Sequence, residues 1–345
     1  MKKLITITSA LALAGSVSYA MEEADEEMMM EAPAPSIAVS GAAKLGVKNV
    51  STSPSKTSDG MALIEEFEVK FSASGTTDGG LMFGASLAIE QDAQKDGTVK
   101  GSTVYVGGAG GAWKLAFGAP DPGAWSAGGI GITEEDNILR ASGQRIALSG
   151  SVEGASYVIT TNAPTADEVD NQWSAGVTYG AGAVNVGVGM DSEKGLALGA
   201  STDLSGVSTS VFYAKSEQMI PWQAAVAEVP ATVGNTGTPA VAERTAYTEK
   251  ASGVGVKASM SAGESATISV AYSTRKQQRT AVDTDGDTDG IQATTLPAGD
   301  KTKKIQLDFD YALGGGATFN AGVDQVDVEN GAKTTTLEAS IAMSF

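Results

Sequence analysis

Residues 333–345, at the carboxyl end of the chain, read KTTTLEASIAMSF. Every second position from 337 onward is apolar, namely Leu337, Ala339, Ile341, Met343 and Phe345. Small or polar residues fill the positions between them. Side chains of a β-strand point alternately to the two faces of the sheet, whereas a helical face repeats every three to four residues. The stretch therefore predicts a strand with one apolar face and one polar face.

The same alternation recurs along the chain. Residues 304–313 read KIQLDFDYAL and residues 66–71 read EFEVKF, with bulky apolar residues at every second position. Residues 173–179 and 184–191 follow the pattern with Trp, Tyr, Val and Met at the apolar positions. The pattern predicts sixteen strands, at approximately 36–50, 60–74, 80–91, 98–107, 112–118, 143–153, 155–162, 171–180, 183–192, 195–204, 207–217, 250–261, 265–276, 302–313, 316–327 and 333–345.

The connections between these strands alternate in length. Those that follow even-numbered strands are tight and mostly rich in glycine, for example GTTDGG, GGAGGA and GGG. Several that follow odd-numbered strands are long, at 119–142, 218–249 and 277–301. An up-and-down barrel has this asymmetry, because its short turns lie at one rim and its long loops at the other. We therefore predict an all-β fold, a 16-stranded antiparallel barrel.

The two faces of the strands indicate where such a barrel resides. Sixteen strands enclose a lumen too wide for side chains to fill, so the polar set lines a water-filled bore. The apolar set then faces lipid, and closure pairs every backbone group, as hydrocarbon requires. Beyond the amino terminus the chain has no apolar run of about 18 residues, which a membrane-spanning helix needs. A secreted pair of β-sandwiches or a β-helix remains the alternative.

Composition excludes several function classes. The chain has no Cys and no His, so it contains no catalytic relay, metal site or disulfide built on those residues. It has 41 acidic and 23 basic residues, a formal net charge of −18, which disfavours nucleic acid as a partner because phosphate contacts need clustered Lys and Arg. We expect no enzymatic activity and no required cofactor.

The amino terminus precedes the barrel. Residues 1–20 carry Lys2 and Lys3, a short apolar run and a small-residue site ending at Ala20, which together predict a cleaved secretory signal. Residues 21–35 read MEEADEEMMMEAPAP, with six acids and no base. Such a segment cannot bury enough apolar surface to offset its chain entropy, so we predict a disordered acidic leader. A methionine-ligated copper site is a less favoured interpretation.

The signal, the sixteen alternating strands and the terminal Phe345 resemble a Gram-negative outer-membrane general diffusion porin, of the type found in alphaproteobacteria. The resemblance covers residues 36–345. It implies a multi-pass barrel in the bacterial outer membrane with short periplasmic turns, long external loops and a third loop folded into the bore. It also implies homotrimers and passive diffusion of ions and small hydrophilic solutes. The acidic leader and an aromatic content of only 6% depart from the family pattern.

Two further expectations follow from this resemblance. Phe345 is similar to the terminal aromatic residue by which the barrel-insertion machinery recognises its substrates. Outer-membrane lipid and lipopolysaccharide are the expected surroundings of the barrel.

The long segment 218–249 is expected to cap the bore or to pack against a neighbouring subunit, and the sequence does not choose between these roles.

The resemblance places the pore constriction on the segment 119–142. Its acidic residues are Glu134, Glu135 and Asp136, and we expect the opposing bases to be Arg140, Arg145 and Lys114. Acids on an inward loop facing bases on the wall would set a field across the bore and filter ions by sign. With the acidic net charge, this predicts a mild preference for cations. The alternative is that these acids lie on the solvated surface of the loop.

Residues 283–290 read DTDGDTDG and place carboxylates at alternate positions, Asp283, Asp285, Asp287 and Asp289. The pattern is similar to the first half of an EF-hand calcium loop, but Thr294 stands where the bidentate Glu is required. We weigh a low-affinity structural Ca²⁺ site against a solvated acidic turn. The bases just upstream, Arg275, Lys276 and Arg279, are expected to neutralise these acids or to bind lipopolysaccharide phosphates.

Three functions remain open at this point. The first is a general diffusion porin, the second is a solute-specific channel, and the third is a structural or adhesive surface barrel with a closed lumen. Specific channels often carry aromatic slides or basic ladders along the bore, and the predicted inner faces show neither clearly. The general porin is therefore the favoured interpretation.

Overall fold

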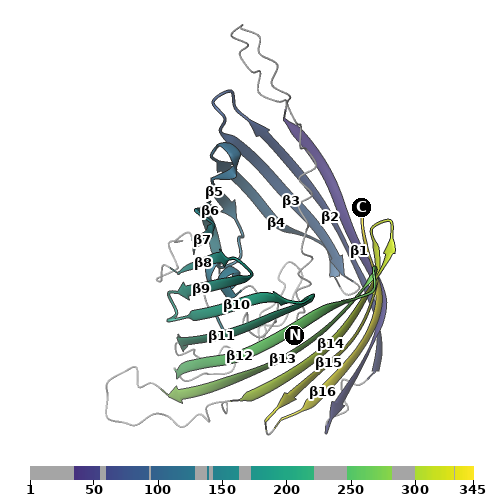
Figure 1. Cartoon of the computed structure of the whole chain (residues 1–345). Helices are drawn as coiled ribbons and strands as arrows, with labels where there is room; N and C mark the ends of the chain where they lie inside the picture. Colours follow the sequence, from purple (N-terminus) through teal and green to yellow (C-terminus); the bar gives the residue numbers. More distant parts are fainter. Residues whose placement is uncertain are drawn as a thin grey trace, which may run out of the picture.

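The computed structural model describes residues 35–54, 60–92, 95–128, 138–139, 143–162, 172–220, 247–281, 300–329 and 331–345. These residues form one closed antiparallel barrel in which each strand pairs with its neighbours in the chain (Figure 1). The strands are β1 Ser36–Ser53, β2 Gly60–Thr76, β3 Met82–Asp92, β4 Lys95–Gly107, β5 Trp113–Gly118, β6 Gln144–Val152, β7 Ala155–Asn162, β8 Trp173–Ala181, β9 Val184–Asp191, β10 Leu196–Leu204, β11 Val207–Ile220, β12 Tyr247–Ala262, β13 Ala266–Ala281, β14 Lys301–Gly314, β15 Ala317–Val328 and β16 Lys333–Ser344.

The first and last strands close the barrel. β1 runs antiparallel to β16, with Ala42 opposite Ser344 and Ser53 opposite Lys333. The backbone N–H and C=O groups of the two strands therefore pair along this seam, as a sheet within hydrocarbon requires. The prediction of a 16-stranded antiparallel barrel is confirmed.

Several strands extend further at the loop rim than the sequence predicts, among them the neighbours β11, β12 and β13. β11 continues to Ile220, β12 begins at Tyr247 and β13 continues to Ala281. The extended parts pair with one another, since Ile220 lies opposite Tyr247 and Tyr247 lies opposite Ala281. The connections predicted as 218–249 and 277–301 are therefore shorter than expected. Residues at the ends of these predicted connections continue the strands, because a neighbouring strand supplies partners for their backbone hydrogen bonds.

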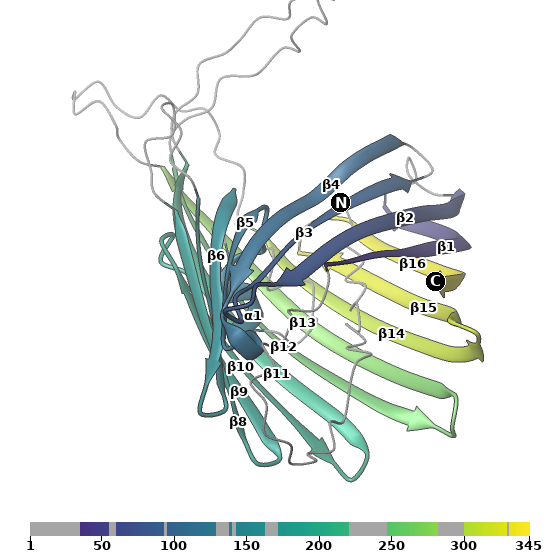
Figure 2. The same ribbon diagram turned by 90° about the horizontal axis from the view of Figure 1, so that it is seen from above.

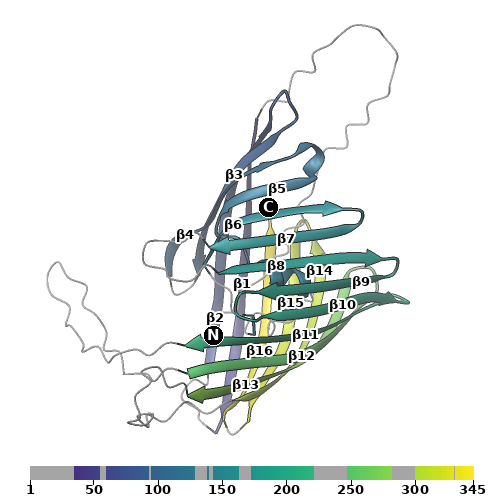
Figure 3. The ribbon, with the colours of Figure 1, turned by 90° about the vertical axis from the view of Figure 1, so that its left-hand side faces the viewer.

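The alternation of side chains matches the two faces of the barrel, whose wall of strands is seen side-on in Figure 3. Leu307 is 49% exposed, and Val188, Val270 and Ile341 are similarly exposed on the outer face. Ser174 is fully buried on the opposite face of its strand, as are other small polar residues. Large apolar side chains that stay exposed around a whole barrel indicate contact with lipid.

The short turns lie at one rim and carry the backbone geometry that tight hairpins need. Glu153 and Gly154 both have positive φ angles, 49° and 82°, and Ser205 and Gly206 have 56° and 86°. Two-residue hairpin loops with positive φ at both positions match the twist of the flanking strands. Glycine at the second position accepts this geometry without a steric cost. These turns set the register of β6 with β7 and of β10 with β11.

Among the residues that the structure describes, two short helical segments interrupt the strands, a 3₁₀ turn at Ala109–Gly111 and α1 at Gly123–Gly128. In the part of the chain that the structure covers, helical segments are too short to cross a bilayer. Figure 2 shows α1 on the inner side of the wall formed by β8 to β10. The chain after β5 thus turns into the barrel at α1.

Candidate pore constriction and lumen wall

The helix α1 is fastened to the inner wall by two backbone donors. The amide of Gly123 donates to Thr160 Oγ1 on β7 at 3.1 Å, and the amide of Ala124 donates to Ser174 Oγ on β8 at 2.8 Å. Both hydroxyls are almost fully buried. They satisfy donors at the start of the helix that have no partner within it.

The contact between α1 and the wall is close enough to require glycine on the strand. A Cβ atom at Gly189 of β9 would lie 2.6 Å from the carbonyl oxygen of Ala124. Ala124 packs further against Leu139 and Ala197, with Trp125 at the edge of this cluster. Small residues of the wall therefore allow the helix to pack closely against it.

The same loop has a second anchor on the wall. Ile138 is fully buried among Phe212 and Ala214 of β11 and Ala251 of β12. The hydroxyl of Ser216 donates a hydrogen bond to the carbonyl oxygen of Ile138. The described residues between β5 and β6, in α1 and at Ile138 and Leu139, therefore contact the inner wall from β7 to β12. The prediction of an inward-folded third loop is confirmed.

Four of the predicted constriction residues lie outside the residues that the structure describes. These are Glu134, Glu135, Asp136 and Arg140. In the sequence, the three acids stand between the two anchors, α1 and Ile138. Their role in the constriction stays a prediction.

Lys114 and Arg145 are described. Lys114 shares a face of β5 with the buried Ala116, so it points into the lumen, and its Nζ lies 5.7 Å from the centre of the Tyr105 ring. It stands near the short turn at Ala109–Gly111, at the opposite end of β5 from the inward loop. Its face is the one that the alternation predicts.

Arg145 occupies a β-bulge. Gln144 pairs with Asn162 and Ile146 pairs with Thr161, so Arg145 is an extra residue without an opposite partner. Its side chain is exposed. Strict alternation assigns Arg145 to the polar face, but a bulge interrupts the alternation and bends the strand locally. The strand pattern therefore does not fix the direction of this side chain.

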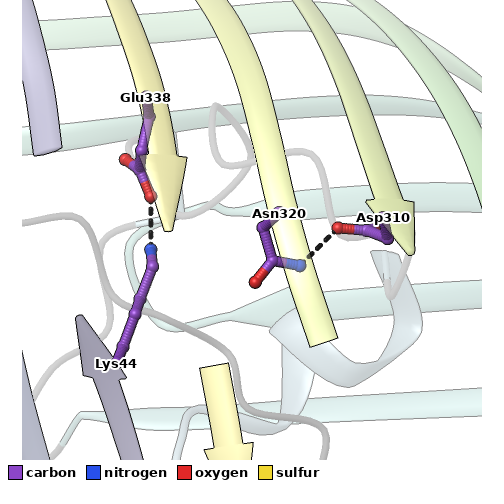
Figure 4. Close-up of polar contacts among 4 residues, drawn as sticks. All are labelled: Lys44, Asp310, Asn320 and Glu338. Atoms are coloured by element: carbon purple, nitrogen blue, oxygen red, sulfur yellow. Dashed lines mark hydrogen bonds and ion pairs between the residues drawn. The ribbon is translucent and has the colours of Figure 1, made fainter. Parts of the chain in front are cut away.

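The lumen wall carries an ion pair and a polar contact that no local sequence pattern indicates (Figure 4). Lys44 of β1 forms an ion pair with Glu338 of β16, and Asn320 Nδ2 of β15 donates to Asp310 Oδ1 of β14 at 2.6 Å. Lys44 and Glu338 are 294 positions apart in the sequence. No local signal joins them, because only the closure of the barrel brings β1 beside β16.

A second ion pair lies toward the loop rim. Glu249 of β12 stands directly opposite Arg279 of β13, and Arg279 Nε lies 2.7 Å from Glu249 Oε2. Gln277 donates to the other oxygen of Glu249 at 3.3 Å, and the Arg279 guanidinium lies 5.9 Å from the Tyr247 ring centre. Both charged side chains are mostly buried, so this pair is held in one geometry at the wall.

The three bases predicted to form a cluster lie on opposite faces of β13. Arg275 and Arg279 point to the inner face of β13, whereas Lys276 points outward with Gln278. The three residues therefore do not form one site. The acidic run with Asp283, Asp285, Asp287 and Asp289 lies outside the described residues, and no metal-ligand cluster of three or more acids occurs among those that are described. The calcium site stays a prediction.

The carboxyl terminus completes the seam of the barrel. Phe345 forms backbone hydrogen bonds with Gly41 of β1, and its ring stacks on Phe67 of β2 at a centroid distance of 6.4 Å. The side chain is 69% exposed on the outer face near the short-turn rim. This exposure leaves the ring available to an assembly factor, and its recognition by such a factor stays a prediction.

The closed barrel with its apolar outer face, its polar bore and its inward loop defines an outer-membrane channel. The profile of the Gram-negative porin family matches residues 5–331. The chain belongs to this family, and its function is passive diffusion across the bacterial outer membrane. A comparison with curated proteins found no match.

Solved structures support the same fold. The chain is similar to OmpT of Vibrio cholerae with loop L8 deleted, with a TM-score of 0.65, 10% identity, and coverage of 91% of this chain and 100% of that chain. Salmonella typhi OmpF in complex with daunomycin matches with a TM-score of 0.61 and 13% identity. The match covers 90% of this chain and 97% of that chain. A Rh. blastica porin variant matches with a TM-score of 0.61 and 11% identity. The match covers 90% of this chain and 100% of that chain. At these identities the likeness concerns the fold alone.

Proposed function

We propose that this porin is a general diffusion channel with a mild preference for cations, and that Glu134, Glu135 and Asp136 set this preference. The observation that carries the proposal is the double anchoring of the inward loop, through Ala124 on one part of the wall and Ile138 on another. The three acids belong to the chain that joins these anchors. Carboxylates at a narrow passage attract cations and repel anions.

The test is the reversal potential across a salt gradient in a planar bilayer. Replacing the three acids by amides (E134Q, E135Q and D136N together) is expected to lower the cation-to-anion permeability ratio. The matched control neutralises three acids of the short turns, D78N, E153Q and E264Q, and is expected to leave the ratio near that of the unmodified channel. Equal shifts in both variants, or none in the first, would remove the loop acids from the constriction.

The same recordings separate the general porin from its alternatives. A general porin gives ohmic steps whose size follows bulk electrolyte conductivity, whereas a barrel with a closed lumen gives none. A solute-specific channel shows a conductance that one solute blocks at low concentration. The described lumen wall carries mixed charges of both signs rather than a single-sign ladder, which favours the general channel.

Two further parts of the proposal concern assembly and chemistry. We propose that the channel is a homotrimer, as the family resemblance implies, and that it has no enzymatic activity, since the chain lacks His and Cys. Mass measurement of the detergent-solubilised protein tests the first. A mass of one chain, retained under conditions that preserve conductance, would contradict it.

A further inference from the structure

The helix α1 faces one particular part of the barrel wall. It packs on the inner side of β7 to β10, and in the closed ring of strands β16 and β1 lie eight positions from β8 and β9. In a ring of sixteen strands that separation is half the circumference. Figure 2 shows α1 on one side of the barrel and β16 and β1 on the other. The passage that α1 leaves open is therefore bounded by the wall around β16 and β1.

Two charged residues of this wall lie at the height of the helix. Ser174, which accepts a hydrogen bond from the start of α1, lies seven residues from the end of β8 at the short-turn rim. Glu338 lies six residues from the end of β16 at the same rim, and Lys44 lies eight residues from the start of β1 there. Similar counts from one rim give similar heights in the wall. Lys44 and Glu338 thus stand across the bore from α1.

Lys44 and Glu338 form an ion pair over the seam of the barrel, and Figure 4 shows their side chains pointing toward one another. They are not directly opposite each other in the register, so the pair crosses the seam diagonally, over Gly46 and Ser340. Glycine allows this approach, since a Cβ atom at Gly46 would lie 2.5 Å from Ser340 Cβ. The two charged side chains are 19% and 21% exposed, so both charges meet the water of the bore.

The wall on both sides of the pair is acidic. The inner face of β14, β15, β16, β1, β2 and β3 carries, among the described side chains, seven acids and four lysines. The acids are Asp308, Asp310, Asp324, Glu338, Glu66, Glu68 and Glu90, and the lysines are Lys304, Lys44, Lys48 and Lys70. Lys304 is paired as well, with Asp324 at 3.8 Å. The described wall opposite α1 therefore has no excess of positive charge.

We propose that Lys44 and Glu338 are specificity-determining residues of the channel, because each cancels the charge of the other beside the passage. The field of a positive and a negative charge in contact falls off faster with distance than the field of a single charge. A lone lysine at this place would attract anions and oppose acids on the loop. Pairing with Glu338 removes that opposition and so favours cations. The inference rests on the proposed function in one respect, that ions are sorted by sign at the height of the inward loop.

The test is the potassium-to-chloride permeability ratio, obtained from the reversal potential of the refolded full chain in planar bilayers. E338Q adds one positive charge to the wall and is expected to lower the ratio about two-fold, since the removed charge lies on the order of 10 Å from a passing ion. K44Q removes one positive charge and is expected to raise the ratio by a similar factor. K44E/E338K keeps the pair in reversed order and is expected to have the ratio of the unmodified channel.

The matched control is an ion pair of the same residue types on the other side of the wall. Lys194 lies 2.7 Å from Glu217, which shares the outward face of β11 with Tyr213. K194Q and E217Q make the same charge changes outside the bore. At 0.1 M salt or above, charges more than about 10 Å away are largely screened, so both controls are expected to leave the ratio unchanged.

A charge placed after folding separates selectivity from a role of the pair in closing the seam. The chain has no Cys, so E338C carries a single thiol. Labelling the folded channel with a methanethiosulfonate reagent bearing a sulfonate is expected to restore the ratio of the unmodified protein. The reagent that bears a trimethylammonium group is expected to lower the ratio below that of unlabelled E338C.

Three results would overturn the proposal: shifts of the same sign in E338Q and K44Q, shifts of equal size in the control pair, or equal ratios after the two labels. The triple variant E134Q/E135Q/D136N distinguishes this proposal from the proposed role of the loop acids. If that variant keeps the ratio of the unmodified channel while E338Q and K44Q shift it in opposite directions, the wall pair determines selectivity and the loop acids do not.

Discussion

Gly41 and Phe345 exchange two backbone hydrogen bonds across the seam of the barrel. The amide of Gly41 donates to the main-chain oxygen of Phe345 at 2.7 Å, and the amide of Phe345 donates to the carbonyl oxygen of Gly41 at 3.0 Å. The Phe345 ring lies over Gly41, so that a Cβ atom there would be 2.3 Å from ring atom Cε2. An aromatic ring that covers a glycine on the adjacent strand replaces the side-chain packing that glycine lacks.

The first prediction concerns this seam. Gly41→Ala is expected to displace the Phe345 ring and lower the temperature at which the folded barrel denatures in detergent, measured by gel mobility. Gly79→Ala, in a short turn where the closest contact of a Cβ would be 3.9 Å, is the control and is expected to have little effect. If both variants denature at the temperature of the unmodified protein, the covering ring contributes nothing to the seam.

The second prediction separates the two roles of Phe345. Phe345→Ala keeps the backbone hydrogen bonds to Gly41 but removes the exposed ring. We expect it to reduce the amount of barrel in the outer membrane of cells while the purified chain still refolds in detergent. Phe345→Tyr, which keeps an aromatic ring, is expected to restore assembly. Normal membrane levels of the alanine variant would show that the ring is not an assembly signal.

The third prediction tests the assigned faces with two adjacent residues of β14. Leu307→Arg places a charge on the lipid face at a cost of about 2–4 kcal/mol near the bilayer centre. Gln306→Arg places the same side chain in the lumen, where Gln306 lies opposite Asp324. Refolding yields in lipid vesicles are expected to fall for the first variant only. Similar yields for both would contradict the inside–outside assignment.

The fourth prediction concerns the anchor of the inward loop. Ser174→Ala removes the acceptor of the Ala124 amide and leaves a buried donor without its partner, which costs about 1–3 kcal/mol. The loop is expected to leave the wall more often, so that single-channel current becomes noisier. Ser86→Ala, on the inner face of β3, is the control. Identical current noise in both variants would show that the hydroxyl of Ser174 does not hold the loop.

The alternation of side chains in the sequence was enough to assign the strands and their faces. It placed Leu337 and Ile341 outward and Glu338 inward, and it separates Lys276 from its neighbours Arg275 and Arg279 once it is carried along β13. The reason is that the two-residue period of a strand is a local property of the backbone. It does not assign a face to Arg145, where a bulge adds a residue and interrupts the period.

Contacts between distant segments depend on the closure and register of the barrel. The ion pair of Lys44 with Glu338 and the contacts of α1 with Thr160 and Ser174 each join segments that no local pattern relates. The strand order and the stagger of each pair place these residues side by side, and a shift by one residue would send each side chain to the other face. The sequence alone therefore determined which residues face lipid and which face water. Only the tertiary structure decided which of them meet, because contact requires the register that the closed sheet imposes.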